Sequence, residues 1–495
     1  MATFPLSISP TQRYLVDATG VPFPIYGDSP WGGHCNVSPA DQEVYLRDRQ
    51  AKGFTTLLVS AIEHDFTLNA PPLDFVSNLP FTKRLDAANY TGSPNGTTAA
   101  NGNNDQFSAN NYSNADTQSP DFTFPTAAYW TRLHDFLTLC EKYGFAILFF
   151  PGYVGFAGDQ EGFMVEMVAN DAVTGAGGQD GQPFADAAKS KLWNYGAWIA
   201  NDFAAHKNLI WVMGGDYGSG GSSGTFTGPQ QTAVSNLYAG IKSVSGQSSV
   251  LRTAHWSRPS KASDVTLSAG SFDLESVYSD NTPADHHRNA YVKTKPVFGI
   301  ETRYEGQGGG TTPFRKYDWW CAVSGGCGFC HGKATSQPTW DFRTGWESDL
   351  NSQGDADAGR LSRFMRTVRW WDLVPSGLGG QKTIVTVNGS TQNAQDYVAA
   401  AADIAGTVCV AYVPPAWANT DFTVDMTVMG STAVAWWFDP TNATYQSIGT
   451  FANTGTNVFT PPGTNSAGDT DWVLLMRAAN VVMAWPGSSP GMVLR

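Results

Sequence analysis

The sequence predicts an α/β fold in which a (β/α)₈ TIM barrel is followed by a small antiparallel β-sandwich. Its 495 residues exceed the length of one ordinary domain. Up to about residue 375, short apolar runs alternate with helical patterns, which is typical of repeated βα units. Beyond that point the helical periodicity disappears and short β-rich runs take over. We therefore expect a barrel domain at 1–378 and a β-sandwich domain at 379–495.

About eight apolar runs have the length and composition of buried strands, which is the number that a closed barrel requires. They lie at 24–27, 54–60, 145–150, 209–213, 250–253, 274–278, 297–300 and 325–331. Helices are expected between them. One begins with Ser38 as its cap and Pro39 in its first turn. Another carries apolar residues at helical spacing from Trp130 to Cys140, and Gly144 ends it. A third apolar stripe covers 192–203.

Two further segments differ from this pattern. The stretch 89–119 is rich in Asn, Gly, Ser and Thr, and we expect a long loop that shapes a binding face. The expected sandwich strands include 383–387, 407–413 and 433–438, separated by Gly, Asn and Pro. In the last of these, Trp436 and Trp437 are neighbours and must point to opposite sides of the sheet. We expect one of the two rings to lie in the core, although a pair of Trp rings can also bind carbohydrate.

The composition excludes several classes of function. A formal charge of −13 argues against a nucleic-acid partner and against anionic membrane surfaces. No apolar stretch approaches the roughly 20 residues of a membrane span. The chain has no phosphate-binding loop, no dinucleotide fingerprint and no Gly-x-Ser-x-Gly elbow, so no cofactor is expected. No signal peptide is visible, yet we expect a secreted or periplasmic protein. The oligomeric state stays open.

Six cysteines are too few for a disulfide framework at this length. Cys321, Cys327 and Cys330 cluster in the sequence, so oxidation of one pair stays open. The segment from Cys327 to His331 matches a haem-attachment pattern, but nothing around it resembles a small haem domain. A zinc site would lack a second ligand pair nearby. We therefore expect no metal.

Two expected strands lead directly into a carboxylate. One run ends at Asp216 after Gly214 and Gly215, and another ends at Glu301. The carboxyl ends of parallel barrel strands meet at one mouth, where two acids are the minimum equipment for cleaving a glycosidic bond. The two glycines allow close approach of backbone and substrate. The alternative is structural: Asp216 would cap the next helix and Glu301 would pair with Arg303 or a nearby Lys.

The order of several motifs resembles glycoside hydrolase family 140, the apiosidase-like barrels. The matching segments are 13–20, 27–31, 45–54, 208–216, 296–306 and 369–375. Segments 437–440, 459–462 and 471–474 are similar to the small β-domain that follows those barrels, often labelled as a putative collagen-binding domain. The resemblance covers nearly the whole chain.

The resemblance implies a retaining hydrolase with Asp216 as acid/base and Glu301 as nucleophile. It also implies that Glu305 supports the sugar or orients Glu301, and that Asp28 and Trp31 line the pocket floor. Relatives often carry Gly-His-Thr-Tyr-Gly where this chain reads Gly-Phe-Cys-His-Gly at 328–332. Because we expect that segment and the loop 89–119 at the binding face, the sugar need not be apiose.

Other candidates for substrate binding follow expected strands or lie beside the catalytic acids, where rings stack on sugars and imidazoles bind hydroxyls. They are His64, Tyr153, His255, Trp256, Tyr278, Tyr304 and His331. For each, the alternative is a packed or solvated residue without a role in binding.

The sequence thus predicts a glycosidase of exo or endo type that acts on a plant or microbial glycan, with water as the second substrate. A non-catalytic carbohydrate-binding or adhesion protein on a barrel scaffold is the main alternative. A polysaccharide lyase is disfavoured, because the paired acids and the acidic net charge suit a uronate substrate poorly.

Overall fold

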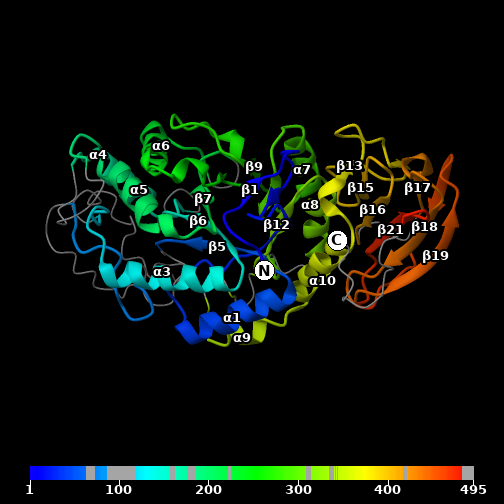
Figure 1. Ribbon diagram of the computed structural model, residues 1–495, viewed down its shortest axis with the longest axis horizontal. Helices are drawn as coiled ribbons and strands as arrows, with labels where there is room; N and C mark the ends of the chain where they lie inside the picture. The colour runs from blue at the N-terminus through cyan, green and yellow to red at the C-terminus, as the bar shows by residue number, and fades with distance from the viewer. Residues whose placement is uncertain are drawn as a thin grey trace.

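The computed structural model describes residues 1–62, 73–85, 119–155, 162–175, 186–220, 224–307, 314–333, 339, 342, 344–415 and 421–481. Its larger part is the predicted barrel (Figure 1). The parallel strands are β4 (Ile25–Asp28), β5 (Thr56–Ser60), β6 (Ala146–Phe150), β7 (Leu209–Gly214), β8 (Arg252–His255), β10 (Glu275–Tyr278), β11 (Val297–Glu301) and β12 (Gly328–Cys330). Each corresponds to one of the eight expected runs, so the barrel prediction is confirmed.

The ring of strands closes between β8 and β10. The amide of Asp273 donates to the carbonyl of Arg252 at 2.9 Å, and the hydroxyl of Thr253 donates to the carbonyl of Leu274 at 3.2 Å. A short strand, β9 (Ser260–Lys261), is added antiparallel to β10. A small antiparallel sheet near the N-terminus contains β1 (Ser7–Ile8), β2 (Leu15–Val16) and β3 (Pro22–Phe23).

Helices surround the barrel, and their ends follow the capping signals of the sequence. They are α1 (Pro39–Lys52), α3 (Ala127–Lys142), α4 (Met164–Ala172), α5 (Lys191–Asp202), α6 (Gly228–Ser243), α7 (Pro283–Tyr291), α8 (Arg315–Val323), α9 (Trp346–Asp349) and α10 (Gln353–Thr367). The Ser38 side chain accepts from the amide of Asp41 at the start of α1. Gly53, with φ +90°, ends this helix in the left-handed conformation that glycine adopts without strain.

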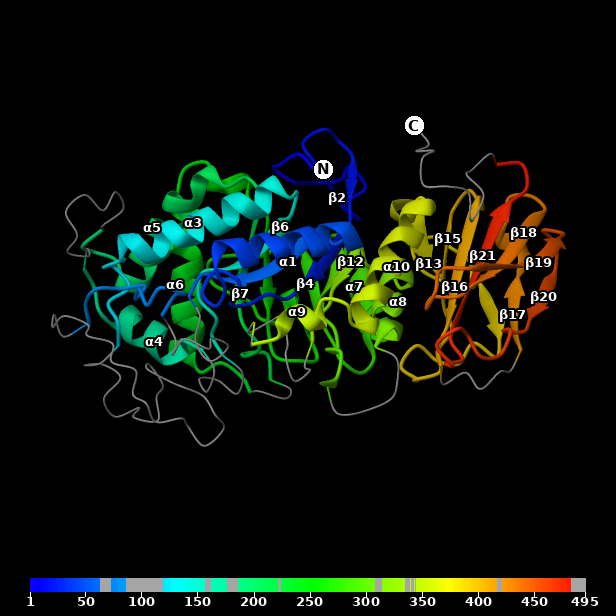
Figure 2. The same cartoon turned by 90° about the horizontal axis from the view of Figure 1, so that it is seen from below.

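The C-terminal part is an antiparallel sandwich (Figure 2). Its larger sheet contains β13 (Leu373–Pro375), β15 (Ala399–Asp403), β16 (Val408–Val413), β21 (Trp472–Ala478), β18 (Ala433–Phe438) and β19 (Tyr445–Phe451). The smaller sheet contains β14 (Val385–Val387), β17 (Phe422–Asp425) and β20 (Thr456–Phe459). The larger sheet already begins at β13, while the expected domain boundary at residue 378 stays a prediction.

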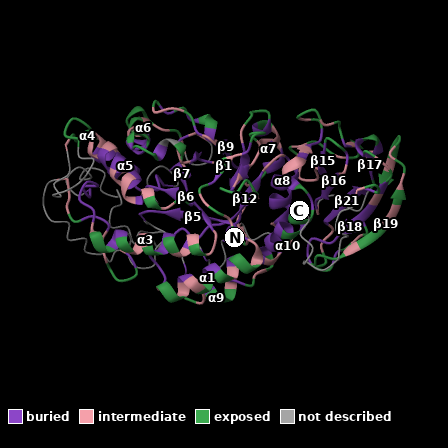
Figure 3. Cartoon of the chain, in the orientation of Figure 1, coloured by how far each residue is buried: buried purple, intermediate pink, exposed green. Residues whose placement is uncertain are grey.

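The central strands of the larger sheet, β15, β16, β18 and β21, are buried on both faces, whereas the edge strand β19 is partly exposed (Figure 3). Trp437 belongs to the core between the two sheets, whereas Trp436 belongs to the continuous core shared with the barrel. Both rings are buried, so neither is placed to stack on a sugar at the surface. On the barrel side, Trp319 of α8 stacks on Tyr412 of β16 with ring centroids 5.7 Å apart. The sandwich is therefore packed on the barrel through an apolar interface.

None of the helices in the described ranges is long and apolar enough to cross a membrane.

Candidate active site

Four consecutive strands of the barrel end in a cluster of polar side chains. Glu301 is the last residue of β11, Tyr278 of β10 and His255 of β8, and Asp216 lies two residues beyond β7. Because the strands are parallel and adjacent, their carboxyl ends lie along one arc of the barrel mouth. The structure thus brings together the two predicted acids and two of the predicted binding residues.

The imidazole of His255 contacts both acidic residues. Its Nδ1 accepts a hydrogen bond from the backbone amide of Asp216 at 3.2 Å, and its Nε2 lies 2.9 Å from Oε2 of Glu301. Since Nδ1 is an acceptor, the proton of the neutral ring resides on Nε2, the nitrogen beside the Glu301 carboxylate, where the two groups make a close polar contact rather than an aligned hydrogen bond. His255 is fully buried, so this contact is shielded from water.

Tyr278 and Arg258 complete the surroundings of Asp216. The Tyr278 hydroxyl donates to Oδ2 of Asp216 at 3.4 Å, and its ring packs against His255. Burial raises the pKa of Tyr278 well above its ordinary value, and the charges of Glu301 and Asp216 raise it further. Tyr278 therefore stays a neutral donor. Burial lowers the pKa of Arg258, but the charges of Tyr278, Asp280, Asp216 and Glu301 outweigh it, and the pKa rises.

The glycine pair before Asp216 is required by close packing. A Cβ on Gly214 would lie 2.3 Å from the His255 carbonyl, and a Cβ on Gly215 would lie 2.4 Å from a ring carbon of Tyr153. Both glycines have positive φ, and so has Asp216, at +51°. A non-glycine residue in this region is uncommon, and such strain clusters at functional sites. The sharp turn directs Asp216 toward Tyr278.

A second group of rings adjoins Glu301. The indole of Trp31 donates to the Tyr304 hydroxyl at 3.0 Å, and Trp31 packs against Tyr153 with centroids 5.4 Å apart. Burial raises the pKa of Tyr304 well above its ordinary value, and the charge of Glu301 and a hydrogen bond to it act in the same direction. Tyr304 therefore connects Trp31 with Glu301.

A buried network of charges lies around Asp28 and His331. Arg49 contacts Asp28 at 2.5 Å and Asp355 at 2.8 Å, and Lys333 contacts Asp355 at 2.6 Å. His331 lies 3.5 Å from Asp318 and 3.8 Å from Asp355. Nearly all of these side chains are inaccessible to solvent.

The charges in this network shift two pKa values. Burial raises the pKa of Asp28, but the charges of Arg49 and His331 and a hydrogen bond from Tyr45 outweigh it, so the pKa is lowered. Burial lowers the pKa of His331, whereas the hydrogen bond and charge of Asp318, with Asp355, raise it to about 9. Both residues are held as ions inside the protein, which fits a supporting role better than contact with a sugar.

Other expected residues lie apart from the cluster. The carboxylate of Glu305 accepts from Ser352 at 2.7 Å and from the amide of Gly354 at 2.8 Å, at the start of α10. The Trp256 indole donates to the Ala262 carbonyl and is buried, so it is part of a packed wall. His64 lies outside the described residues, as does the expected loop 89–119 apart from Ser119.

The segment 328–332, which differs from the apiosidase-like pattern, lies inside the barrel. Phe329 and Cys330 are fully buried, and the Cys330 sulfur is so close to Gly27 that a Cβ there would lie 2.5 Å from it. With His331 in the charge network, this difference affects the interior beneath the site rather than its surface.

All six cysteines are buried free thiols, so none of them is part of a disulfide. In the described ranges, no three His, Cys, Asp or Glu side chains gather as a metal site would need. Sequence reasoning missed Arg258, although it lies only three residues after His255 in the same loop. It also missed the partners of Asp28 and His331, which come from distant parts of the chain.

Comparisons with known proteins agree with the barrel and sandwich architecture. The family model described as "Apiosidase-like, catalytic domain" matches residues 9–372. Residues 381–477 are similar to the "Putative collagen-binding domain of a collagenase". No curated protein matches the chain significantly.

Solved structures share the fold. One described as "Glycoside hydrolase" has a TM-score of 0.68 and 16% identity, covering 97% of this chain and 100% of that one. A glycoside hydrolase family 5 protein from Bacteroides vulgatus has the same TM-score and identity, covering 97% and 95%. A putative glycoside hydrolase from the same organism has a TM-score of 0.56 and 11% identity, covering 96% and 82%. With three quarters of its length matched by the catalytic-domain model, this chain belongs to the apiosidase-like family and is a glycoside hydrolase.

Proposed function

We propose that the protein is a retaining glycosidase of the family 140 type, in which Asp216 is the acid/base and Glu301 the nucleophile. The observation that supports this most directly is the contact of one imidazole with both residues, through Nδ1 to Asp216 and through Nε2 to Glu301. The contact with Asp216 is made by its backbone amide, and the Tyr278 hydrogen bond to its carboxylate adds support for a single site shared by the two acids, as cleavage of a single acetal demands.

In the proposed first step, Asp216 protonates the leaving oxygen while Glu301 attacks the anomeric carbon and forms a glycosyl ester. Asp216 then removes a proton from water, which attacks the ester and releases the sugar and Glu301. The Nε2 proton of His255 and the hydroxyl of Tyr304 stabilise the Glu301 carboxylate and fix its orientation. Tyr278 and Arg258 stabilise the negative charge that Asp216 acquires when its proton leaves.

The substrate that this family membership favours is a plant or microbial glycan with a terminal or internal apiose-like residue. Purified enzyme incubated with pectic, hemicellulosic and arabinan oligosaccharides should release sugar from at least one class. In a retaining reaction the first product formed has the anomeric configuration of the substrate, which NMR of the early reaction detects. Release of the opposite anomer would replace the retaining proposal with an inverting one.

The variants Asp216→Asn and Glu301→Gln test the assignment of roles. Each keeps the shape of its side chain and removes the ionisable group, so each should lower kcat/KM by roughly a thousandfold or more. Thermal unfolding should stay close to that of the wild type. Azide restores turnover to enzymes whose acid/base or nucleophile is missing, so partial rescue by azide is expected. Wild-type rates in either variant would refute the assignment. Glycan binding without any hydrolysis by the unmodified protein would favour a binding protein instead.

A further inference from the structure

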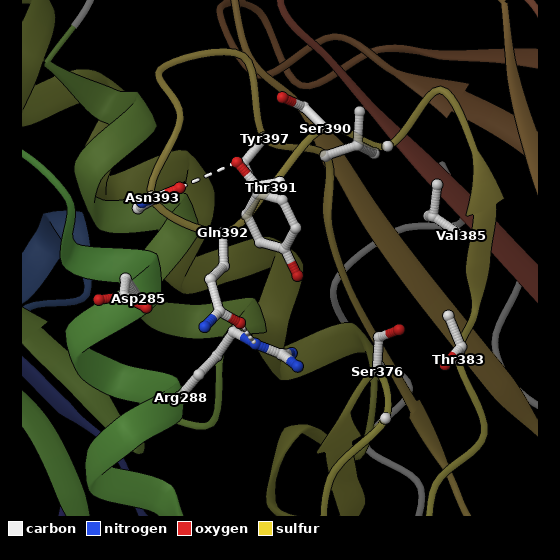
Figure 4. A pocket seen from close by; sticks show the side chains of 13 residues that line it. Asp285, Arg288, Ser376, Thr383, Val385, Ser390, Thr391, Gln392, Asn393 and Tyr397 are labelled. Carbon is white, nitrogen blue, oxygen red and sulfur yellow. Dashed lines mark hydrogen bonds between the residues drawn. The ribbon is translucent and has the colours of Figure 1, made fainter.

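A polar cavity lies between the barrel and the sandwich, and none of its lining residues belongs to the catalytic cluster (Figure 4). Its volume is about 550 Å³, within the range of roughly 300–1,000 Å³ that small-molecule sites occupy. One wall is α7 of the barrel, which contributes Asp285 and Arg288. The other walls come from the segments around β13 to β15, which contribute residues 376–377, 383, 385, 389–393 and 397–398.

The lining of this cavity is mainly polar. Arg288 uses only its Nε for a hydrogen bond, to the amide oxygen of Gln392 at 2.8 Å. Among the described residues, its two terminal nitrogens and the carboxylate of Asp285 have no hydrogen-bond or ion-pair partner, so they are available to a ligand. Figure 4 shows Arg288 and Gln392 extending from opposite sides toward one another, with the ring of Tyr397 beside them. Paired donors and acceptors next to an aromatic ring suit a ligand rich in hydroxyl groups.

The cavity wall is hydrogen-bonded to the loop that follows Tyr278, one member of the catalytic cluster. Helix α7 begins five residues after Tyr278, whose hydroxyl contacts Asp216. In the connecting loop, Asn281 accepts two hydrogen bonds from Gln395 of the sandwich, at 2.7 Å to its carbonyl and 3.0 Å to its side chain. The Lys316 ammonium on α8 donates a hydrogen bond to the side-chain oxygen of the same Gln395 at 2.8 Å. The cavity therefore lies beside the barrel mouth, on the side of the sandwich.

We propose that this cavity is a second carbohydrate-binding site, which takes a saccharide unit of the same glycan that the barrel cleaves. This inference rests on the proposed function for the identity of the ligand. The guanidinium and carboxylate would each bind sugar hydroxyls, and the Tyr397 ring would lie against a sugar face. Such a site increases the affinity for a long chain through effective concentration, without any new contact at the scissile bond.

Binding is tested in the full-length Glu301→Gln protein, so that no ligand is consumed. The cavity variant combines Arg288→Met with Asp285→Asn, which removes both charged groups and preserves the net charge. Its matched control combines Arg47→Met with Glu43→Gln, an ion pair on α1 in which Arg47 is exposed and Glu43 partly exposed. Affinity electrophoresis in gels containing pectic, hemicellulosic or arabinan polysaccharide measures the dissociation constant. We expect the cavity variant to raise this constant about tenfold for one polysaccharide, and the control to leave it unchanged.

The same two variants in the active enzyme provide an independent readout. The cavity variant should lower kcat/KM about tenfold on the polysaccharide and leave it unchanged on an oligosaccharide too short to reach both sites. Equal losses on both substrates, an unaltered dissociation constant, or no retention of the protein by any polysaccharide would overturn the proposal. Displacement by inorganic phosphate but not by oligosaccharide would make it an anion site instead. If Glu301→Gln proved active, the proposed function would fail, while the gel experiment would still report on the cavity.

Discussion

At the scale of single residues, replacing His255 is the most direct test of how Glu301 is held in position. Replacing it with Phe keeps a ring against Tyr278 and Phe150 but removes the proton that faces Glu301. Glu301 would then lose a donor that orients it. A polar interaction with a charged group contributes about 1.5–3 kcal/mol, so its loss should cost about 10- to 100-fold in activity. Steady-state kinetics should show this loss mainly in kcat, with thermal stability almost unchanged. Wild-type kcat in His255→Phe would show that the contact is only structural.

Tyr278 should influence the pH profile rather than substrate affinity. Its hydroxyl donates to Asp216 and stays protonated at all working pH values, because burial raises its pKa well above the ordinary value. Tyr278→Phe removes a hydrogen bond that favours the carboxylate form of Asp216 over the acid form. The acid form must protonate the leaving group, so the alkaline limb of kcat/KM against pH should move to higher pH. If kcat/KM fell by the same factor at every pH and the shape of the profile stayed the same, this role would be contradicted.

His331 makes folding stability depend on pH. Its pKa is raised from 6.5 to about 9 in the folded protein. A raised pKa means that the contribution to stability is fully present below pH 6.5 and is lost as pH rises through about 9. Urea unfolding at a series of pH values should show this decline in the wild type. In His331→Gln the decline should be smaller, and the comparison of the two proteins cancels the contribution of other groups. Parallel curves for both would contradict the prediction.

At the scale of elements, Glu305 caps a helix. Its two carboxylate oxygens accept from Ser352 and Gly354, so it supplies a negative charge where the dipole of α10 is positive. Glu305→Ala should therefore lower the free energy of unfolding by about 1–2 kcal/mol. The kcat/KM of the folded enzyme should change by less than about twofold, because the carboxylate is engaged away from Glu301. Glu305→Gln distinguishes helix capping from a role at the active site. A large loss of activity with little loss of stability would favour the role that the family resemblance implies, which is to support the sugar or to orient Glu301.

The elements themselves were largely predictable, because barrel strands such as β6 and β7 are short continuous apolar runs buried on both faces. The acids at positions 216 and 301 could be predicted for the same reason, since strand direction alone sends both to one mouth. Side-chain direction was not predictable. Trp256 follows a strand as closely as His255 does, yet it turns into the packing around Phe272. Glu305 and His331 have their partners on α8 and α10, and no local pattern indicates such distant contacts.

At the scale of the whole molecule, the barrel and the sandwich share one core and one buried charge cluster. Arg315 of α8 donates from Nε to Asp471 of the sandwich at 2.7 Å, and a terminal nitrogen lies 3.1 Å from Asp357 of α10. Burial lowers the pKa of Arg315, but Asp471 and Asp357 raise it above its ordinary value. The same interface contains the Trp319–Tyr412 stack. Because the interface is both apolar and charge-paired, the two parts should unfold together rather than separately.

This coupling makes Arg315→Met a test of the assembly as a whole. The substitution leaves Asp471 and Asp357 buried without their shared cation, and breaking a buried pair in this way costs about 3–5 kcal/mol. Thermal unfolding followed by tryptophan fluorescence and by circular dichroism should shift to lower temperature, with both signals moving together. Arg315→Lys keeps the charge but loses the forked geometry, so its shift should be intermediate. The ion pairs that Arg315 makes among the described residues are with Asp357, Asp469 and Asp471, outside the catalytic cluster, so kcat/KM at low temperature should stay close to that of the wild type. A separate early transition of the sandwich, with the barrel transition unmoved, would show that the two parts fold independently.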